Sequence, residues 1–476
     1  MTNKLRWLLV AESGEFHTKS LQTRRRFRRV LRSRLRAGLA TRAPAAWVVR
    51  PRRRPLMIRA PEHAVESAAA VAAHTFGVHA VREAVPFAER PLDLLIGELG
   101  EYLRPRVAGR TFAVRARKRG GQRWRTNDFA ADLGARLFDA SAGVDLESPE
   151  VEIKVELFGD TAWVVEREWP GPDGLPLGTQ ERVVSLLSGG FDSAVAAWML
   201  MRRGAPTDFL HLMLECAQSD HATALAHHLV REWAPGTRPR VWMLDAEAVN
   251  GVLTELVRSD LRQMVLKQVM FTAADRFAER AGYPALVTGD ALGQVSSQTL
   301  SNLVTLDAYT SRPVLRPLVG LPKEEIVAQA KRLGTHDLSA RAKEVCDLGN
   351  GPVSVAASPH DLARAGGDVV EALVEQSLAG LRVLDVSEWV PGMSAVPVSG
   401  EPPEGSESVH VDKPGDDPAV PHGRPIAVGG RGAVSVATRL AAVGHDVRVV
   451  HPAAAPGLSE GSPRRAAGTG SRQDAA

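Results

Sequence analysis

The chain has 476 residues, of which 44% are hydrophobic and 24% charged, and its formal net charge is +4. This length predicts about three folded units rather than one hydrophobic core, and no segment approaches the roughly 20 apolar residues of a membrane span. The apolar segment near the start is too short for a signal peptide, so we expect a cytoplasmic protein, and the two cysteines, Cys216 and Cys346, exclude a disulfide framework.

The first 60 residues are strongly basic. They hold 17 lysines and arginines against Glu12 and Glu15, so this segment carries +15 and the rest of the chain −11. Residues 20–38 place apolar side chains at helical spacing among arginines, with Gly38 as a C-cap, which predicts a helix with one packing face and one basic face. Such a patch favours a polyanionic partner. A basic helix that only faces solvent is the alternative.

Residues 62–168 are expected to form a compact α+β unit. Two helical segments are followed by the strand-like stretch RTFAVRARKRG (110–120), a third helix and the strand pair EVEIKVELFGDTAWVVERE (150–168). Residues 169–181 are dense in Gly and Pro and are expected to be a linker.

Residues 182–350 alternate apolar strands with amphipathic helices, which predicts an α/β fold with a doubly wound parallel sheet. Residues 351–392 are assigned to a C-terminal extension of this domain. Residues 393–423 lack periodicity and are rich in Pro, Gly, Ser and acidic residues, which predicts a disordered linker. A strand–helix–strand pattern at 424–455 precedes a polar tail at 456–476, which is also expected to be disordered.

The stretch SLLSGGFDSAVAAWML (185–200) joins a buried strand to a helix. We expect the strand to end at Leu187 and the helix to begin near Ser193, with a turn at 188–192. The glycines of SGGFDS allow positive φ and a close approach to a ligand, and the amides at a helix start suit a phosphate. The GxxxxGK[ST] pattern of a Walker loop is absent. A tight turn without a ligand is the structural alternative.

SGGFDS resembles the loop of PP-loop ATP pyrophosphatases, which have an adenine nucleotide alpha hydrolase-like fold and cleave ATP between its α and β phosphates. Together with ALVTGDALGQVSSQTLSNL, LRPLVGLPKEEIVAQAKRLGT and KEVCDL, it resembles, in order and spacing, the tRNA 4-thiouridine synthetase (tRNA sulfurtransferase, ThiI) family. Residues 1–60 resemble the ferredoxin-like domain of that family, and residues 62–168 resemble its THUMP RNA-binding domain.

This resemblance implies replacement of the C4 oxygen of a tRNA uridine, at position 8, by sulfur. Adenylation would turn that oxygen into the leaving group AMP, which a sulfur nucleophile displaces. The implied cofactors are ATP and Mg²⁺, and the implied partners are tRNA and a cysteine desulfurase or other sulfur donor, without a membrane. A homodimer and a role in thiamine thiazole synthesis are left open.

By the same resemblance, three residues are expected to be catalytic. Asp192 would act through magnesium or by orienting the phosphates, Lys323 would offset developing charge, and Cys346 would handle sulfur. The structural alternatives are a solvent-exposed helix lysine and a buried, unreactive thiol. Arg341 and Lys343 would lower the pKa of the Cys346 thiol, whereas Glu344 and Asp347 oppose them. Cys216 is taken as structural.

The resemblance also assigns ligand contacts. The expected ATP contacts are Leu186, Leu187, Ser188, Gly189, Gly190, Asp192, Ser193, Lys267, Gly289 and Gln298. The expected RNA contacts are Lys19, Arg24, Arg25, Arg28, Arg115, Arg117, Lys118 and Arg119. No metal site is expected among the protein side chains, because His221, His227 and His228 lack the spacing of a zinc motif.

Some family members end in a rhodanese-like domain whose cysteine accepts persulfide sulfur and then forms a disulfide with the cysteine that Cys346 matches. IAVGGRGAVSVATRLAAVGHDVRVVHP (426–452) resembles the end of that domain, but Gly429 or Gly430 occupies the cysteine's place, so we interpret it as a degenerate remnant. Dinucleotide binding is the alternative, although His451 stands where a ribose-binding acid is expected.

Two other functions are kept as alternatives. A PP-loop adenylating enzyme with a non-sulfur nucleophile would need no thiol, and Cys346 argues against it. A tRNA-binding protein without catalysis would not need SGGFDS or Lys323, and both are intact.

Overall fold

The protein is described by a computed structural model that divides into two compact units. Unit 1 comprises Met1–Glu181, Trp198–Pro206 and Leu229–Thr237, and unit 2 comprises the remainder. The structure describes residues 4–49, 56–88, 91–119, 125–158, 161–214, 219–340, 353–399, 407–410, 426–429 and 447–450, and also Val434, Ala437 and Ala441. Of the helices in these ranges, none combines the length and apolar content that crossing a bilayer requires.

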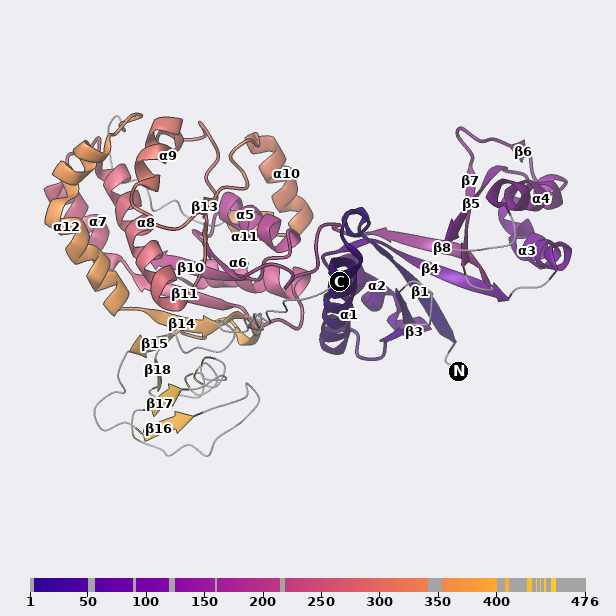
Figure 1. Ribbon diagram of the computed structural model, residues 1–476, viewed down its shortest axis with the longest axis horizontal. Coiled ribbons are helices and arrows are strands. Elements are labelled where there is room, and N and C mark those ends of the chain that lie inside the picture. The colour runs from indigo at the N-terminus through magenta and orange to yellow at the C-terminus, as the bar shows by residue number, and fades with distance from the viewer. Residues whose placement is uncertain are drawn as a thin grey trace, which may run out of the picture. The chain divides into compact units, whose positions relative to one another are not determined.

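Unit 1 contains an eight-stranded sheet in the order β2-β3-β1-β4-β8-β7-β5-β6 (Figure 1). Its first half consists of β1 (Leu5–Glu12), α1 (Leu21–Arg42), β2 (Trp47–Val49), β3 (Leu56–Pro61), α2 (Val65–Ala73) and β4 (Val78–Ala88). Its second half consists of α3 (Leu92–Val107), β5 (Thr111–Arg119), α4 (Thr126–Phe138), β6 (Gly143–Val144), β7 (Val151–Phe158) and β8 (Thr161–Pro170).

The helices of the first half share one hydrophobic core. Phe27, Leu31 and Leu35 recur every four residues along α1 and are buried against β1, β3 and α2, as the helical spacing predicts. The alanine-rich helix α2 packs in this same cluster. Residues 62–88 therefore pack with the first 60 residues, because the small alanine side chains of α2 allow this helix to lie close to its neighbours. The domain boundary expected from sequence separates these two segments.

The second half has its own core, formed by α3, α4, β5, β7 and β8. The long strands β4 and β8 pair antiparallel from Ala80↔Pro170 to Ala88↔Thr161 and so run through both halves. The segment after β8, expected to be a linker, is packed in unit 1. The amide of Gly171 donates to the carbonyl of His79 at 2.8 Å, and Leu175 is buried in the first core.

Unit 2 is built on the strands β9 (Val183–Leu186), β10 (Thr207–Met213), β11 (Arg240–Asp245), β12 (Leu286–Val287) and β13 (Val314–Leu315), in the order β13-β12-β9-β10-β11. Their neighbouring pairs are all parallel. The chain runs from β9 outward to β11 and then returns to the other side of β9. This is the predicted doubly wound topology, and its switch point lies between β9 and β12, where ligands bind at the carboxyl ends of such strands.

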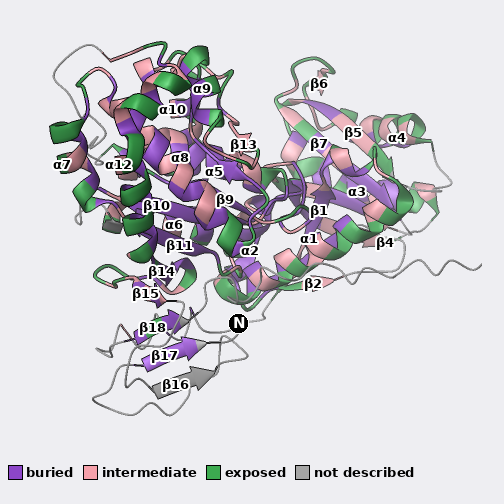
Figure 2. Cartoon of the chain, turned by 60° about the vertical axis from the view of Figure 1, so that its left-hand side comes forward, coloured by how far each residue is buried: buried purple, intermediate pink, exposed green. Residues whose placement is uncertain are grey.

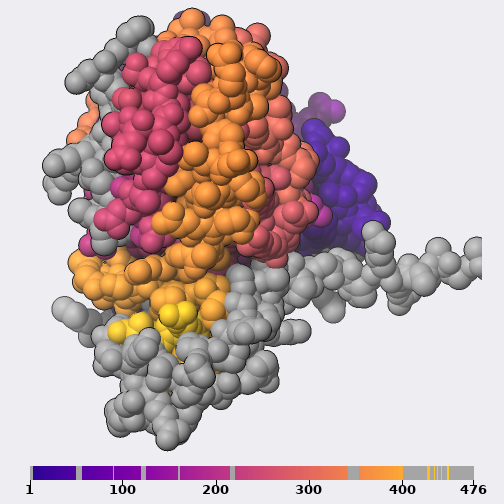
Figure 3. Space-filling view, turned by 90° about the vertical axis from the view of Figure 1, so that its left-hand side faces the viewer, coloured from indigo at the N-terminus to yellow at the C-terminus, as the bar shows by residue number. Residues whose placement is uncertain are grey.

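In the part of the chain that the structure describes, eight α-helices connect or follow these strands: α5 (Phe191–Arg202), α6 (Ser219–Trp233), α7 (Glu247–Leu256), α8 (Arg262–Ala281), α9 (Leu300–Asp307), α10 (Lys323–Leu333), α11 (His336–Ser339) and α12 (Pro359–Ala379). Figure 2 shows β9, β10 and β11 as buried strands in the interior of unit 2. Figure 3 shows α12, in orange, on the surface of this unit, and its buried side packs in the core of unit 2 with α8.

The sheet of unit 2 extends beyond β11 through β14 (Arg382–Asp385), β15 (Val396–Ser399), β18 (Val447–Val450), β17 (Ile426–Gly429) and β16 (Glu407–His410). Two of these strands, β15 and β16, come from the segment expected to be disordered, so that expectation is corrected for them. Composition missed them because it does not show which other strands will supply their hydrogen-bond partners. The parallel strands β17 and β18, with helical residues Val434, Ala437 and Ala441 between them, match the expected strand–helix–strand pattern.

Candidate nucleotide site and RNA-binding surface

The SGGFDS segment forms a tight turn between β9 and α5. The strand ends at Leu186 and the helix begins at Phe191, so the turn is shorter than expected and Asp192 lies in the first turn of the helix. The early helix start is possible because Gly189 adopts a φ of +91°, which reverses the chain within four residues. The Ser193 hydroxyl donates to the carbonyl of Gly190 at 3.1 Å and closes the turn. The first amides of α5 have no intrahelical acceptors and can bind an anion.

The strand end beneath this turn is fixed by β10. The amide of Leu187 donates to the carbonyl of Leu210 at 2.8 Å, and Nδ1 of His211 lies 2.7 Å from the carbonyl of Leu187. His211 is buried, and this burial lowers the pKa of its imidazole. Its Nδ1–H donates to the carbonyl of Leu187 and supports the turn, a role that was not predicted from sequence.

Asp192 and Lys323, which were expected to be catalytic in separate roles, lie in direct contact. Lys323 is the first residue of α10, and its ammonium donates to Oδ1 and Oδ2 of Asp192 at 2.9 and 3.0 Å. The Gln294 side-chain amide donates to Oδ2 of Asp192 at 3.0 Å. Gln294 was not predicted, although it lies in the matched segment ALVTGDALGQVSSQTLSNL.

A second pair of charges lies at the end of β12. The ammonium of Lys267 in α8 donates to Oδ1 of Asp290 at 3.2 Å, and Gln298 Nε2 is 3.4 Å from the same oxygen. Burial raises the pKa of Asp290, but Lys267, the Thr288 hydroxyl and Arg316 lower it, and the net shift is downward. Two predicted ATP contacts, Lys267 and Gln298, therefore converge on a carboxylate that was not predicted.

Gly289 links the two pairs. A Cβ atom on this residue would lie 2.7 Å from the carbonyl carbon of Asp192 and from the amide nitrogen of Ser193. Real Cβ atoms do not approach that closely, so only glycine lets the end of β12 touch the start of α5. Its predicted role as an ATP contact is therefore accompanied by a packing role that fixes the loop.

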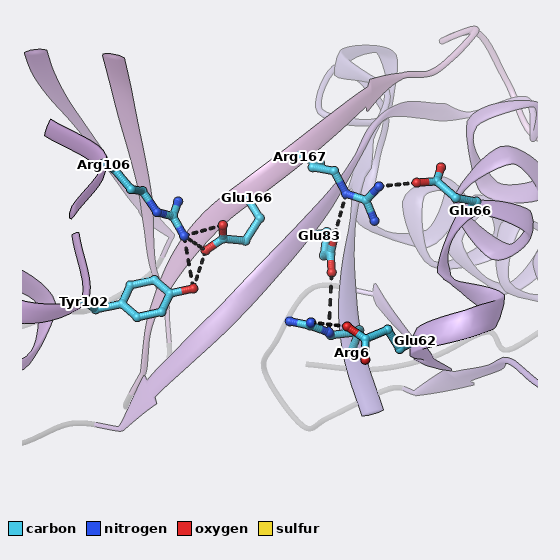
Figure 4. Close-up of polar contacts among 8 residues, drawn as sticks. All are labelled: Arg6, Glu62, Glu66, Glu83, Tyr102, Arg106, Glu166 and Arg167. Carbon is cyan, nitrogen blue, oxygen red and sulfur yellow. Dashed lines mark hydrogen bonds and ion pairs between the residues drawn. The ribbon is translucent and has the colours of Figure 1, made fainter. Parts of the chain in front are cut away.

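Figure 4 shows two ion-pair networks that hold α2 and α3 against β1, β4 and β8 in unit 1. Arg106 and the hydroxyl of Tyr102 on α3 both bond to Glu166, and burial followed by this contact raises the pKa of Tyr102. The second network joins five residues, Arg6, Glu62, Glu66, Glu83 and Arg167. The second network bridges the two halves of the unit, because Arg167 on β8 contacts Glu66 on α2 and Glu83 on β4.

The predicted arginines of α1 differ in availability. Arg28 Nε donates to both carboxylate oxygens of Glu12, at 2.8 and 2.9 Å, and Arg24 donates to the carbonyls of His17 and Lys19. Arg25 is exposed and, with the unpredicted residues Arg26 and Arg29, lines a surface hollow of about 610 Å³. The hollow therefore gathers three arginine side chains on one part of this helix.

On β5 the predicted arginines share a strand face. Val114 and Ala116 pack into the core with the helices, so Arg115 and Arg117 point to the opposite face of the sheet. Arg115 pairs with Glu152 at 3.3 Å, and Arg117 and Lys118 are exposed. The side chain of Arg119 lies outside the described residues.

Comparison with known proteins identifies the family. The family model described as "Thiamine biosynthesis protein (ThiI)" matches residues 178–369, and that of the THUMP domain matches residues 99–165. The tRNA sulfurtransferase of Desulfurococcus amylolyticus is 36% identical over 81% of this chain and 81% of its own length. The probable tRNA sulfurtransferase of Aeropyrum pernix is 38% identical over 72% of this chain and 88% of its own length. The chain belongs to the tRNA sulfurtransferase family.

The structural neighbours have the same fold. A crystal structure of a 4-thiouridine synthetase in complex with RNA and with bound ATP superposes with a TM-score of 0.67 at 24% identity, over 80% of this chain and 99% of that chain. PH1313 from Pyrococcus horikoshii superposes with a TM-score of 0.52 at 21% identity, over 69% of this chain. The family, the fold class and the enzyme class predicted from sequence are therefore confirmed.

Several residues expected from the tRNA sulfurtransferase resemblance lie outside the described residues. They are Cys346 with its charged neighbours in 341–352, Cys216 in 215–218, Gly430 and His451. The roles expected for them stay predictions. Among the described residues no group of three or more His, Cys, Asp or Glu is placed to hold a metal. His227 Nδ1 and His228 Nε2 each lie within 3.0 Å of a backbone carbonyl, as structural histidines do.

Proposed function

We propose that this chain uses ATP to replace the C4 oxygen of a tRNA uridine by sulfur, forming 4-thiouridine at position 8. The observation that carries the proposal is the contact between Lys323 and Asp192 at the start of α5, directly after a glycine turn at the switch point of the sheet. Family membership supports the reaction class, and the neighbour with bound ATP and RNA supports both ligands.

The glycine turn and the first amides of α5 would hold the phosphates of ATP. Lys267, Gly289 and Gln298, at the end of β12 and on the helices beside it, would hold the remainder of the nucleotide. Gly289 links the Asp192–Lys323 pair to the Lys267–Asp290 pair, so the nucleotide would lie along one continuous edge of the site.

In the first step, the C4 oxygen of uridine attacks the α-phosphorus of ATP, and the bond to the β-phosphate breaks with release of pyrophosphate. Lys323 offsets the negative charge that grows on the transferring phosphate, and Asp192 orients the ammonium. Mg²⁺ bound to the phosphates would neutralise the leaving pyrophosphate. Asp192 fits it as a protein ligand, because one carboxylate with phosphate oxygens is a common magnesium environment.

In the second step, a sulfur nucleophile attacks C4, the bond from C4 to oxygen breaks, and AMP leaves. We assign the handling of this sulfur to Cys346. With glycine in place of the rhodanese cysteine, Cys346 would accept the outer sulfur of a persulfide on a cysteine desulfurase, and the desulfurase thiolate would leave. The outer sulfur of the Cys346 persulfide would attack C4, and an external thiol would then reduce the bond between the two sulfur atoms and leave the outer one on the uridine. Free sulfide is already reduced and would attack C4 directly. Arg25, Arg117 and their basic neighbours would hold the tRNA through its phosphates.

Both alternative functions have weaker support than tRNA thiolation. Family membership disfavours an adenylating enzyme with a non-sulfur nucleophile. The Lys323–Asp192 contact disfavours a tRNA-binding protein that has lost catalysis.

The test is mass spectrometry of nucleosides from the tRNA of a strain that lacks the endogenous enzyme. Restoring this chain should restore 4-thiouridine, and restoring its Asp192→Ala variant at equal expression should not. Equal recovery with both would contradict the proposal, as would absence of 4-thiouridine with the intact chain in the presence of a sulfide source.

A further inference from the structure

Asp290 lies at the centre of the second charge cluster and is 5% exposed. One of its oxygens, Oδ1, faces both Lys267 Nζ and Gln298 Nε2, at 3.2 and 3.4 Å. The other, Oδ2, accepts a hydrogen bond from the Thr288 hydroxyl at 2.7 Å. The rotamer of the carboxylate is thus fixed by Thr288, and a fixed carboxylate fixes the two side chains that bond to it.

The orientation given to Gln298 leaves one of its atoms available. Its amide nitrogen faces Asp290, and its Oε1 is buried with no hydrogen-bond partner among the described residues. A buried acceptor without a donor is unfavourable until a ligand supplies one. Asp290 decides this polarity, because a carboxylate accepts hydrogen bonds and therefore selects the amide nitrogen of Gln298.

Lys267 is held in the same way. An ammonium has three N–H donors, and the contact with Asp290 uses one of them, so two can turn to a nucleotide. The Lys267 side chain is 18% exposed and that of Asp290 is 7% exposed, so water competes weakly for this contact.

We propose that Asp290 is a positioning residue for nucleotide binding, which acts through Lys267 and Gln298 without touching the transferring phosphate. The inference rests on the proposed function, because it requires ATP at this site. It goes beyond it by assigning the affinity for ATP to the Asp290 cluster and phosphoryl transfer to the separate Asp192–Lys323 pair.

The structure provides a matched control at Arg316. Its guanidinium lies 3.5 Å from Oδ2 of Asp290 and 2.6 Å from Oδ1 of Asp307. Asp290→Asn and Asp307→Asn therefore each remove one carboxylate charge beside the same arginine. Only Asp290 also bonds to Lys267 and Gln298, so loss of ion pairing at Arg316 alone would affect both variants alike.

The experiment measures the KM for ATP and kcat for tRNA-dependent pyrophosphate release, with the Kd for ATP measured by calorimetry on the full chain. Asp290→Asn should raise both KM and Kd about tenfold, as expected for weakened hydrogen bonds to a charged group, with kcat within about threefold. Asp307→Asn should leave all three constants within about twofold of the unchanged protein. An unchanged Kd in Asp290→Asn, or equal losses in the two variants, would overturn the proposal.

A double-mutant cycle tests the route of the effect. If Asp290 acts through Lys267, Asp290→Asn should weaken ATP binding far less in a Lys267→Met background than in the unchanged protein. Independent, multiplying effects would contradict the proposal. The double variant also removes both charges together, so it serves where Asp290→Asn alone fails to fold. If Asp290→Asn alone fails to fold, the double variant is compared with Lys267→Met. A further tenfold loss of ATP affinity in the double variant would then count against the inference.

Different results would reject the proposed function and the role of Asp290. An unchanged protein that does not bind ATP would reject the proposed function. If the unsubstituted protein binds ATP and Asp290→Asn binds it equally well, only the role of Asp290 is rejected.

Discussion

The ammonium of Lys323 lies within 3.0 Å of both carboxylate oxygens of Asp192, although 131 positions separate the two residues in sequence. Lys323 begins α10 and Asp192 lies in the first turn of α5. Two helix starts thus meet beside the glycine turn, where the positive ends of both helices favour phosphate.

Removing either charge should stop adenylation. We expect Asp192→Ala and Lys323→Met to lower the rate of pyrophosphate release at least about a hundredfold, because each removes an electrostatic contact that acts on the transferring phosphate. The affinity for tRNA should stay within a few fold, since the basic surfaces lie on other elements. Lys331→Met, at an exposed lysine in the last turn of the same helix, is the matched control and should be nearly silent.

The arginines of α1 should contribute unequally to RNA binding. Arg25 and Arg29 line the basic hollow, whereas Arg28 is already neutralised by Glu12. Arg25→Ala with Arg29→Ala should therefore reduce the slope of log affinity against log salt by about two, and Arg28→Ala should change it by less than one. Filter binding of tRNA over a salt series measures both. An unchanged slope in the double variant would mean that the hollow faces solvent.

The close approach at Gly289 should not tolerate a methyl group. Gly289→Ala places a Cβ atom 2.7 Å from the backbone of Asp192 and Ser193, so we expect a loss of about 1–3 kcal/mol in the free energy of unfolding and weaker ATP binding. Gly320→Ala is the control, because a Cβ there meets no atom within 4 Å. Equal stability of the two variants would show that the loop shifts freely.

The Asp290 carboxylate should make stability depend on pH. Burial raises its pKa, but Lys267, Thr288 and Arg316 lower it to below its ordinary value, so the folded state binds the proton less readily than the unfolded state. Its contribution is therefore present above the unfolded pKa of about 3.9 and is lost as pH falls through the lower folded value. Urea unfolding should show a gap between the unchanged protein and Asp290→Asn that narrows in acid. A gap that is constant with pH would contradict this.

The tail should be dispensable for sulfur transfer. Truncation near residue 395 would remove β15, which pairs with β14 and buries Val396 in the core, so the informative truncation follows Ser399. We expect this truncated chain to form 4-thiouridine with sulfide as the donor. Failure of the truncated chain, if it is folded, would show that β16–β18 take part.

The cysteines should differ sharply. With a cysteine desulfurase and an external thiol as the sulfur source, Cys346→Ser is expected to eliminate 4-thiouridine while pyrophosphate release persists, and Cys216→Ser is expected to be close to silent. Full thiolation by Cys346→Ser with sulfide would show that sulfur attacks the adenylated base without a protein thiol.

The local features of the fold could be predicted from sequence, because they depend on residues close together in the chain. The spacing of Phe27, Leu31 and Leu35 predicts α1, and the alternation of strand and helix after residue 182 predicts the parallel sheet. The strand β15 was missed because VPVS becomes a strand only when β14 and β18 supply its hydrogen-bond partners.

The candidate site was predicted in its parts but not in its connections. Motif resemblance located Lys267, Gln298 and Lys323, yet it gave no sign that Asp290 holds the first two or that Gln294 bonds to Asp192. Such contacts depend on how strand ends, turns and helices pack, and not on spacing along the chain, so only the tertiary structure shows them. The pairing of Arg28 with Glu12 escaped for the same reason, since charge counting treats every arginine of α1 as equal.

The most direct test of the central claim is the stoichiometry of a single reaction with the purified protein, unmodified tRNA, Mg²⁺, sulfide and ATP labelled at the α- and γ-phosphates. The account predicts one AMP and one pyrophosphate for each 4-thiouridine found by nucleoside mass spectrometry. Formation of 4-thiouridine with release of ADP and orthophosphate, or without consumption of ATP, would contradict it.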